Sequence, residues 1–233
     1  LLSEAHGILG DRVVAMTARS ILLPPGEIED AEKITRELGV PHILVDVDPM
    51  VWPDFVANPP ERCYLCKKRL FGILIRRLER MGIRHLVHGA NMDDQRDFRP
   101  GMKAAEELGV IAPLMAAELT KADIRALARQ RGLFSWNKPA MACLATRIAC
   151  GTPISAETLH QIRDAEKVLT DAGFEGCRVR HHGAIARIEV GLADLPRLAA
   201  PPLGPWIAEQ LKTIGFSHVC ADLNGYVTGS MNP

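Results

Sequence analysis

The first half of the chain alternates short apolar runs with amphipathic stretches, and this alternation limits the possible folds most strongly. The runs RVVAMTA (12–18) and PHILVDVD (41–48) are typical of buried parallel strands, and RHLVHGA (84–90) predicts a third strand. Residues 24–39 begin with prolines, carry apolar side chains at helical spacing and end at a glycine, which predicts a helix. Strands separated by helices imply right-handed crossovers and a parallel α/β sheet that binds ligands at the carboxyl ends of its strands.

Two more helical patterns follow in the sequence. The basic stretch at 67–82 has an apolar face, and residues 119–133 repeat apolar side chains at helical spacing. In the second of these stretches, we predict Thr120 as the N-cap, and Asp123 follows three residues later. This spacing is close to a capping box and predicts where the helix begins.

The pattern changes after residue 133. Residues 134–155 have no clean periodicity and are expected to form a linker and a site loop. A capped helix, a hairpin turning near Gly183, a short helix and a last strand are then predicted at 155–174, 177–190, 205–216 and 218–226. We therefore predict an α/β domain at 1–138 and a smaller α+β domain at 139–233.

Composition narrows the classes of partner. The 233 residues are 47% hydrophobic, enough for a sizeable core, and 28 basic residues balance 28 acidic ones. No overall field therefore attracts nucleic acid or an anionic membrane. The chain lacks both an apolar run of about 20 residues and a signal-peptide pattern, which predicts a soluble, cytoplasmic protein with no membrane partner. Because LLSEAHGILG resembles the second half of a helix, we expect the natural chain to begin before Leu1.

Two cysteines, Cys63 and Cys66, form a CxxC pair just before a predicted helix. The helix N-terminus and neighbouring basic residues favour thiolates, which bind metals. Cys143 lies apart, in the irregular loop. From spacing alone, a four-iron cluster with three cysteine ligands, a zinc site completed by histidine, a redox pair and an inert pair all stay open. The remaining cysteines are expected to be buried structural thiols, namely Cys150, Cys177 and Cys220.

Two other stretches carry polar side chains in suggestive patterns. Asn91, Asp93, Asp94, Asp97 and Arg99 follow the third predicted strand, where they form either a ligand site or merely a capped helix start. In the predicted hairpin, Arg178 and Arg180 share one face of a strand, and Arg187 and Glu189 share a face of the returning strand. Paired guanidinium groups suit a phosphate, and the alternative is an exposed, salt-bridged face. Lys138, Arg147 and Glu166 are of types usually found at the surface.

Taken in order, six stretches resemble the LarE-type sulfur transferases, a branch of the PP-loop ATP pyrophosphatase superfamily. They cover about 13–232 and read NPPERCYLCKKRLF, HGANMDDQRDFRPGMKAAEELGVIAPL, LTKADIRALARQRGL, WNKPAMACLATRIACGTPIS, RVRHHGAIARIEV and DLNGYVTGSMN. The resemblance implies a parallel-sheet, adenine nucleotide α hydrolase-like (PP-loop) domain followed by a smaller α+β domain. It also implies adenylation of pyridinium-3,5-biscarboxylic acid mononucleotide and replacement of oxygen by sulfur, in the biosynthesis of the nickel-pincer nucleotide cofactor.

The resemblance further implies an ATP and Mg²⁺ site. The family's Ser-Gly-Gly-Val-Asp-Ser signature is not in this sequence, and we expect it to precede Leu1. The nucleotide-binding positions that match are Thr17, Ala18, Gly89, Asn91, Asp93 and Arg99.

The cysteines match the family's three-cysteine subtype. Cys63, Cys66 and Cys143 are implied as catalytic residues and as metal ligands of a [4Fe-4S] cluster, whose open iron could carry the transferable sulfur. Thr146 stands where the family pattern has serine. A sulfide or other sulfur donor and a homo-oligomeric assembly are the implied partners. The implied substrate-binding residues are Arg147, Arg178, Arg180, Glu166 and Glu189.

Two alternatives stay open at this point. A PP-loop enzyme that thiolates tRNA would also use three cysteines and a cluster, but the balanced charge and the lack of a basic, aromatic-rich tract argue against RNA. The other alternative is a non-catalytic nucleotide sensor or zinc-stabilised scaffold.

Overall fold

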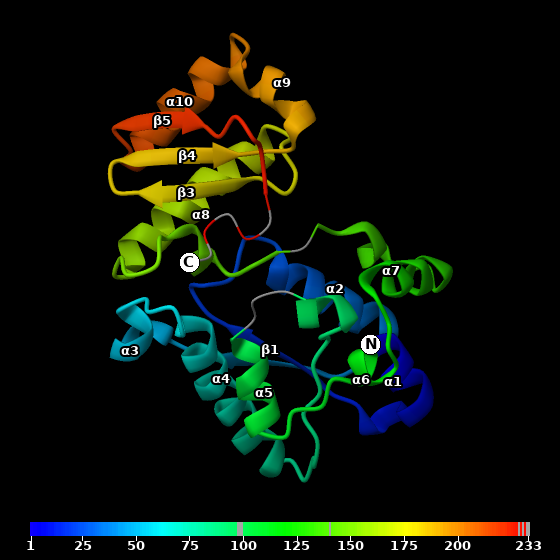
Figure 1. Cartoon of the computed structure of the whole chain (residues 1–233). Coiled ribbons are helices and arrows are strands. Elements are labelled where there is room, and N and C mark those ends of the chain that lie inside the picture. Colours follow the sequence, from blue (N-terminus) through cyan, green and yellow to red (C-terminus); the bar gives the residue numbers. More distant parts are fainter. Residues whose placement is uncertain (97–99, 140, 228, 230, 232–233) are drawn as a thin grey trace. The chain divides into compact units, whose positions relative to one another are not determined.

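The computed structural model describes residues 1–96, 100–139, 141–227, 229 and 231 (Figure 1). The chain divides into two compact units, each assembled from several stretches of sequence. Unit 1 comprises Leu1–Ser20, Gly26–Pro49 and Glu61–Lys138. Unit 2 comprises Ile21–Pro25, Met50–Pro60 and Pro139–Pro233.

Unit 1 is a mixed α/β structure with a parallel sheet. Strands β1 (Ala15–Arg19) and β2 (His42–Asp46) pair in parallel, with Thr17 level with Leu44. Helix α2 (Glu27–Leu38) connects them and ends at Gly39, whose left-handed backbone lets its N–H reach the carbonyls of the last turn. The predicted strand–helix–strand order is confirmed for this part of the chain.

The predicted third strand at 84–90 is wrong as a full strand. Only Val87 pairs, forming an isolated parallel bridge with Ile111, and His88 N donates to Ile111 O at 2.9 Å. The partner segment is short because Pro113, two residues after Ile111, has no N–H to donate and starts helix α6 (Pro113–Ala116). The pairing of the two segments therefore cannot continue from Ile111 toward Pro113.

The longest helix of unit 1 covers its core. In α4 (Arg62–Glu79), Phe71 and Leu74 are buried, and they pack in one cluster with Met16 of β1 and Val45 of β2. Helix α5 (Gly101–Glu107) begins against the first turns of α4, and a Cβ at Gly101 would lie 2.8 Å from the Cδ of Lys67. The other elements of this unit are α1 (Leu2–Leu9), α7 (Lys121–Gln130) and 3-10 turns at Gly10–Arg12, Met92–Arg96 and Phe134–Asn137.

Unit 2 contains a three-stranded sheet in the order β3-β4-β5 (Figure 1). Strands β3 (Arg178–His182) and β4 (Ile185–Glu189) form the predicted antiparallel hairpin around Gly183, and β5 (His218–Ala221) runs parallel to β4. Val179 and Ile188 face each other on the apolar side of the hairpin and belong to the core that α8 (Ala156–Asp171) and α10 (Leu203–Ile214) share. Shorter elements are α3 (Pro53–Val56), α9 (Leu195–Ala199) and 3-10 turns at Pro49–Val51, Leu144–Arg147 and Leu192–Asp194.

Asn58 connects segment 50–60 to the rest of unit 2 by hydrogen bonds. Its side chain is fully buried, and Nδ2 donates to Ala149 O at 2.8 Å and to Thr152 O at 2.7 Å. Its own carbonyl accepts from Gly151 N at 2.8 Å. Segment 50–60 therefore belongs structurally to the loop at 149–154.

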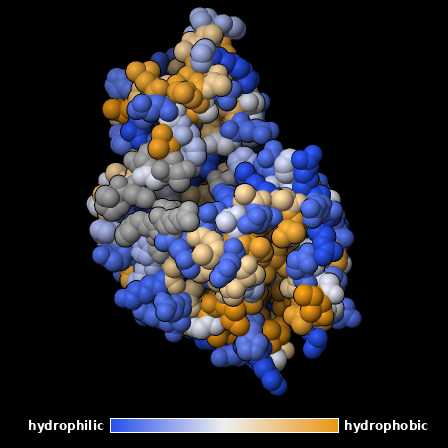
Figure 2. Space-filling view, turned by 45° about the vertical axis from the view of Figure 1, so that its right-hand side comes forward, coloured by the Kyte–Doolittle hydropathy of each residue, from blue (hydrophilic) through white to orange (hydrophobic). Residues whose placement is uncertain are grey.

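Some large hydrophobic side chains stay at the surface, as Figure 2 shows for one face. Ile8 in α1 is 77% exposed, and none of the residues of that helix is buried. Among the described residues, no helix combines the length and apolar character needed to cross a bilayer.

Candidate functional site

A buried polar face on the β3–β4 hairpin is the most unusual feature of unit 2. The register places Arg178 opposite Glu189 and Arg180 opposite Arg187, so all four share one face. Arg178 is 2%, Arg180 5% and Glu189 0% exposed. The alternative of an exposed, salt-bridged face is therefore wrong, because these charges lie inside the unit.

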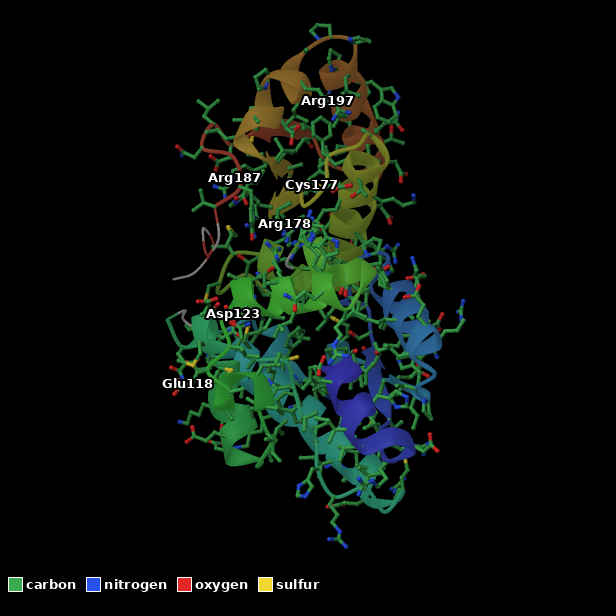
Figure 3. The ribbon with its side chains drawn as sticks, turned by 90° about the vertical axis from the view of Figure 1, so that its right-hand side faces the viewer. Glu118, Asp123, Cys177, Arg178, Arg187 and Arg197 are labelled. Carbon is green, nitrogen blue, oxygen red and sulfur yellow. The ribbon has the colours of Figure 1, made fainter. Side chains whose placement is uncertain are left out.

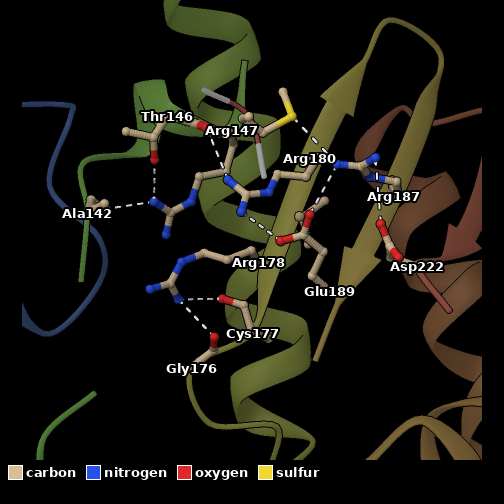
Figure 4. Close-up of polar contacts among 12 residues, drawn as sticks. Ala142, Thr146, Arg147, Gly176, Cys177, Arg178, Arg180, Arg187, Glu189 and Asp222 are labelled. Carbon is tan, nitrogen blue, oxygen red and sulfur yellow. Dashed lines mark hydrogen bonds and ion pairs between the residues drawn. The ribbon is translucent and has the colours of Figure 1, made fainter. Parts of the chain in front are cut away.

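Glu189 holds two of these arginines (Figure 4). Arg180 Nη2 lies 2.6 Å from Glu189 Oε2, and Arg187 Nη2 lies 3.1 Å from Glu189 Oε1. Arg187 also reaches Asp222 just after β5, with Nη1 3.6 Å from Oδ2. One buried carboxylate thus fixes the orientation of two guanidinium groups.

A second ion pair joins Arg147 to Glu166 of α8. Nε and Nη2 of the arginine approach Oε1 and Oε2 of the glutamate at 2.8 and 3.1 Å, and the two side chains are 0% and 4% exposed. Glu166 Oε1 also accepts from the backbone N–H of Val179 at 3.0 Å. The expectation that Arg147 and Glu166 lie at the surface is wrong. Lys138 of unit 1 does reach solvent, where it pairs with carboxylates of α2.

Arg178 completes the arginine cluster. Its Nη1 donates to Cys177 O at 2.7 Å and to Gly176 O at 3.0 Å, and its guanidinium lies 5.1 Å from the ring centroid of Tyr226. Burial, and then the positive charge of Arg147, lower the pKa of Arg178 below its usual value. Buried charge of one sign is costly, so this environment favours an anion as a ligand.

Arginines and acids alternate in this cluster. Among the described residues it holds Arg147, Arg178, Arg180, Arg187, Glu166, Glu189 and Asp222. Guanidinium forks match the oxygens of a phosphate. The cluster is therefore a candidate site for a phosphate monoester.

The loop that carries Cys143 rests on this cluster. Arg147 Nη1 donates to Ala142 O at 2.8 Å and to Cys143 O at 3.1 Å, and Arg180 Nη1 donates to Thr146 O at 3.1 Å (Figure 4). The hydroxyl that Thr146 keeps donates to Cys143 O at 2.8 Å. The Cys143 thiol is half-buried. The loop and the arginines thus form one hydrogen-bonded assembly inside unit 2.

Cys63 and Cys66 lie in unit 1, at the start of α4. Their spacing of three residues puts both thiols on one face of the helix, both are half-buried, and Arg62 Nη2 lies 3.9 Å from the Cys63 sulfur. This donor set fits two thiolate ligands of an iron–sulfur cluster. Within unit 1, and likewise within unit 2, the described residues hold no group of three His, Cys, Asp or Glu side chains placed for a metal ion.

The other three cysteines differ in exposure. Cys177 is buried, and burial followed by the charge of Glu166 raises the pKa of its thiol to about 11, as expected of a structural thiol. Cys150 and Cys220 are exposed, so the prediction that they are buried is wrong. Cys220 lies on the edge strand β5, and Cys150 in the loop that Asn58 holds.

The predicted nucleotide-binding residues of unit 1 come from separate stretches of the chain. Thr17 Oγ1 contacts His42 Nε2 at 2.9 Å across the β1–β2 pair, where Ala18 lies next along β1. Gly89 follows the isolated bridge, and Arg99 lies outside the described residues. The role of these four positions in nucleotide binding stays a prediction.

Asn91 and Asp93 build a turn. Asn91 Oδ1 accepts from Asp93 N at 3.1 Å, and Asp93 Oδ2 accepts from Lys121 N, at the start of α7, at 2.8 Å. Asp93 therefore contacts the first turn of α7, far along the chain, and residues 92–96 themselves form a 3-10 turn. Their nucleotide contacts stay predictions.

Sequence reasoning did not single out Asp222 or Tyr226. Asn224 N donates to Asp222 Oδ1 at 2.9 Å, and Gly225, with φ of 66°, turns the chain so that Tyr226 N reaches Val190 O at 2.8 Å. The Asn-Gly pair within the strand predicted at 218–226 was the available signal, since it favours a turn there; the strand ends at Ala221.

Comparison with known proteins places the chain in a family. No protein-family model matches it. An uncharacterised protein of Synechocystis is 36% identical over 228 residues, which is 98% of this chain and 85% of the relative. The pyridinium-3,5-bisthiocarboxylic acid mononucleotide synthase of Lactiplantibacillus plantarum is 34% identical over 233 residues, 100% of this chain and 84% of the relative. An uncharacterised protein of Methanocaldococcus jannaschii is 34% identical over 171 residues, covering 73% of this chain and 66% of the relative.

The alignment with the Lactiplantibacillus plantarum protein covers this whole chain, and therefore both units with the Cys143 loop and the arginine cluster, and it covers 84% of that relative. The chain therefore belongs to the family of the pyridinium-3,5-bisthiocarboxylic acid mononucleotide synthase, as its six sequence stretches predict.

Proposed function

We propose that the protein is an ATP-dependent sulfur transferase that acts on pyridinium-3,5-biscarboxylic acid mononucleotide, in the biosynthesis of the nickel-pincer nucleotide cofactor. The observation that carries the proposal is the buried arginine cluster, hydrogen-bonded to the Cys143 loop. A mononucleotide brings a phosphate, and the proposed sulfur transfer needs Cys143, as a cluster ligand, close to the bound substrate. The name of the Lactiplantibacillus plantarum relative supports the same substrate class.

In this proposal, Arg178 and Arg180 bind the substrate phosphate. Glu189 keeps Arg180 oriented, since its Oε2 accepts from Nη2 at 2.6 Å, and Tyr226 lies against Arg178. Planar guanidinium groups are well suited to donate hydrogen bonds to phosphate oxygens. The phosphate would fix the mononucleotide so that its carboxylates are presented to the reacting groups.

The proposed reaction has two steps. A substrate carboxylate oxygen attacks the α-phosphorus of ATP, the bond to the β-phosphate oxygen breaks, and pyrophosphate leaves. A sulfur nucleophile then attacks the acyl carbon, and AMP leaves with the former carboxylate oxygen, which yields a thiocarboxylate. ATP would bind in unit 1 at Thr17, Ala18, Gly89, Asn91, Asp93 and Arg99, with Mg²⁺ offsetting the charge of pyrophosphate.

Three thiols would hold the family's cluster. Cys63 and Cys66 present two thiolate donors on one helix face, and Cys143 would be the third ligand. A [4Fe-4S] cluster bound by these residues would supply the transferable sulfur.

The test is an anaerobic assay of full-length protein with ATP, sulfide and the pyridinium dicarboxylate mononucleotide. We expect AMP release together with a thiocarboxylate product, both measured by mass spectrometry. Arg178→Lys should raise the KM for the mononucleotide by about tenfold or more, because lysine cannot reproduce the planar fork. Arg163→Lys is the matched control, since Arg163 lies on the surface of the same unit and pairs with Asp164 at 2.9 Å. Wild-type protein that forms no AMP or thiocarboxylate, or two variants with equal KM, would refute the proposal.

A further inference from the structure

The protein itself supplies a hydrogen-bond acceptor for each guanidinium nitrogen of Arg147. Its side chain is 0% exposed, and all three guanidinium nitrogens have acceptors within unit 2. Nε and Nη2 bind Glu166, while Nη1 lies within hydrogen-bond distance of two carbonyls and of Thr146 Oγ1, at 2.9 Å. The resemblance implies a substrate-binding role for this residue, but its contacts indicate another one.

The two carbonyls that Arg147 holds are those on either side of one α-carbon. Ala142 O belongs to the peptide plane before the Cα of Cys143, and Cys143 O belongs to the plane after it. Fixing both planes sets φ and ψ of Cys143, here −60° and 150°, and therefore the direction of its Cα–Cβ bond. A guanidinium group can bridge the two carbonyls because it is planar and rigid.

The guanidinium is in turn fixed on its other side. Glu166 binds it in a bidentate pair and also accepts from Val179 N, so the arginine is anchored to both α8 and β3. The same loop accepts a hydrogen bond from Arg180 at Thr146 O. The Cys143 backbone is thus tied to the rigid core of unit 2.

We infer that Arg147 is a positioning residue that sets the direction of the Cys143 side chain, the proposed third cluster ligand, with Glu166 as its anchor. The inference deepens the proposed function and rests on it for the catalytic role of Cys143. The restraint on the thiol can be tested without any substrate, through the reactivity of Cys143.

The test is the rate at which iodoacetamide alkylates Cys143 in reduced, cluster-free, full-length protein, measured by peptide mass spectrometry. Exposed Cys150 in the same samples is the internal reference. Arg147→Lys keeps a positive charge beside Glu166 but cannot bridge both carbonyls. The loop should then hold the half-buried thiol less firmly, so that iodoacetamide reaches it more often. We expect the rate at Cys143, relative to that at Cys150, to rise about five- to tenfold, which corresponds to the free energy of one buried hydrogen bond.

Arg197→Lys is the matched control. Arg197 also donates to two consecutive carbonyls in unit 2, Ala172 O and Gly173 O, and lies over the ring of Phe174, but it touches no residue of the Cys143 loop in these contacts (Figure 3). This variant should leave the relative rate at Cys143 unchanged. A rate in Arg147→Lys within about twofold of the control would overturn the inference.

Steady-state kinetics give a second measurement, because a purely structural role of Arg147 would not lower kcat selectively. If the wild-type protein is active, Arg147→Lys should lower kcat by about tenfold or more and leave KM for the mononucleotide nearly unchanged, because a misdirected thiol slows the reaction without weakening substrate binding. Equal losses in Arg147→Lys and Arg197→Lys would contradict the positioning role. An inactive wild type would refute the proposed function, whereas the alkylation result would stand by itself.

If Arg147→Lys does not fold, as judged by circular dichroism, Thr146→Val replaces it. Valine has the shape of threonine but removes the hydroxyl that links Arg147 to Cys143 O. We expect a smaller rise of about two- to fivefold in Cys143 alkylation, and no rise would overturn the inference.

Discussion

Asn58 combines an unusual backbone conformation with burial and two side-chain hydrogen bonds. It has a positive φ of 56°, is fully buried, and donates to two carbonyls of the loop at 149–154. Asparagine adopts this left-handed conformation more readily than other residues with a Cβ. Its amide satisfies backbone groups that would otherwise be buried without partners.

Substitutions of Asn58 should separate the contribution of its side-chain hydrogen bonds from that of its left-handed backbone conformation. Asn58→Gly removes both hydrogen bonds but tolerates the positive φ, and should lower the free energy of unfolding by about 2 kcal/mol. Asn58→Ala loses the same bonds and adds left-handed strain, so it should cost about 1 kcal/mol more. Urea unfolding measures both, and equal losses would show that backbone conformation contributes nothing at this position.

The start of α7 shows how one helix end is defined by several contacts. Thr120 Oγ1 accepts from Asp123 N at 3.3 Å, and Asp123 Oδ2 accepts from Thr120 N at 3.0 Å, which confirms the predicted capping box. Asp93 supplies a third contact, and Glu118, two residues before the N-cap, has a φ of 55° (Figure 3). The box satisfies N–H groups that have no partner within the helix.

Stability of this helix start should depend on pH. The side-chain hydrogen bond from Thr120, and then the backbone bond, lower the pKa of Asp123 below its usual 3.8. A lowered folded-state pKa means that the contribution is present above the unfolded value and is lost as pH falls through the folded one. Thr120→Val should therefore destabilise the protein at about pH 6 and much less at about pH 3, measured by urea unfolding.

Thr213→Val is the control for this prediction. Thr213 Oγ1 donates to the backbone carbonyl of Glu209 in α10, an acceptor that does not titrate. Its effect should be the same at both pH values, and a Thr120→Val effect that does not shrink in acid would contradict the assignment.

Helices were predictable because their signals are local. The N-caps Thr120 and Ser155 and the terminal Gly39 stand within a few residues of the turns they define. The third strand was not predictable, because it depends on a short partner segment that ends before Pro113. Local patterns also could not show that Arg147 pairs with Glu166, 19 residues away, since only tertiary packing makes that pair buried.

For the molecule as a whole, the proposed function needs three thiols from well-separated stretches of sequence to act together. Full-length protein reconstituted anaerobically with iron and sulfide should be brown, with broad visible absorption. Cys63→Ser should abolish this absorption. Cys150→Ser should keep it, because Cys150 is not among the proposed ligands. A full spectrum in Cys63→Ser would remove that residue from the ligand set.

Unit 2 is not a contiguous piece of the polypeptide. Besides Pro139–Pro233, it incorporates Ile21–Pro25 and Met50–Pro60, from which Leu22 O accepts a bond from Leu144 N at 2.8 Å. An expression fragment that begins at residue 139 would lack that acceptor, the Asn58 amide and the buried ring of Phe55. The thiol loop and the phosphate site therefore cannot be excised as an autonomous module by a single cut, and swapping them between homologues would require grafting three segments together.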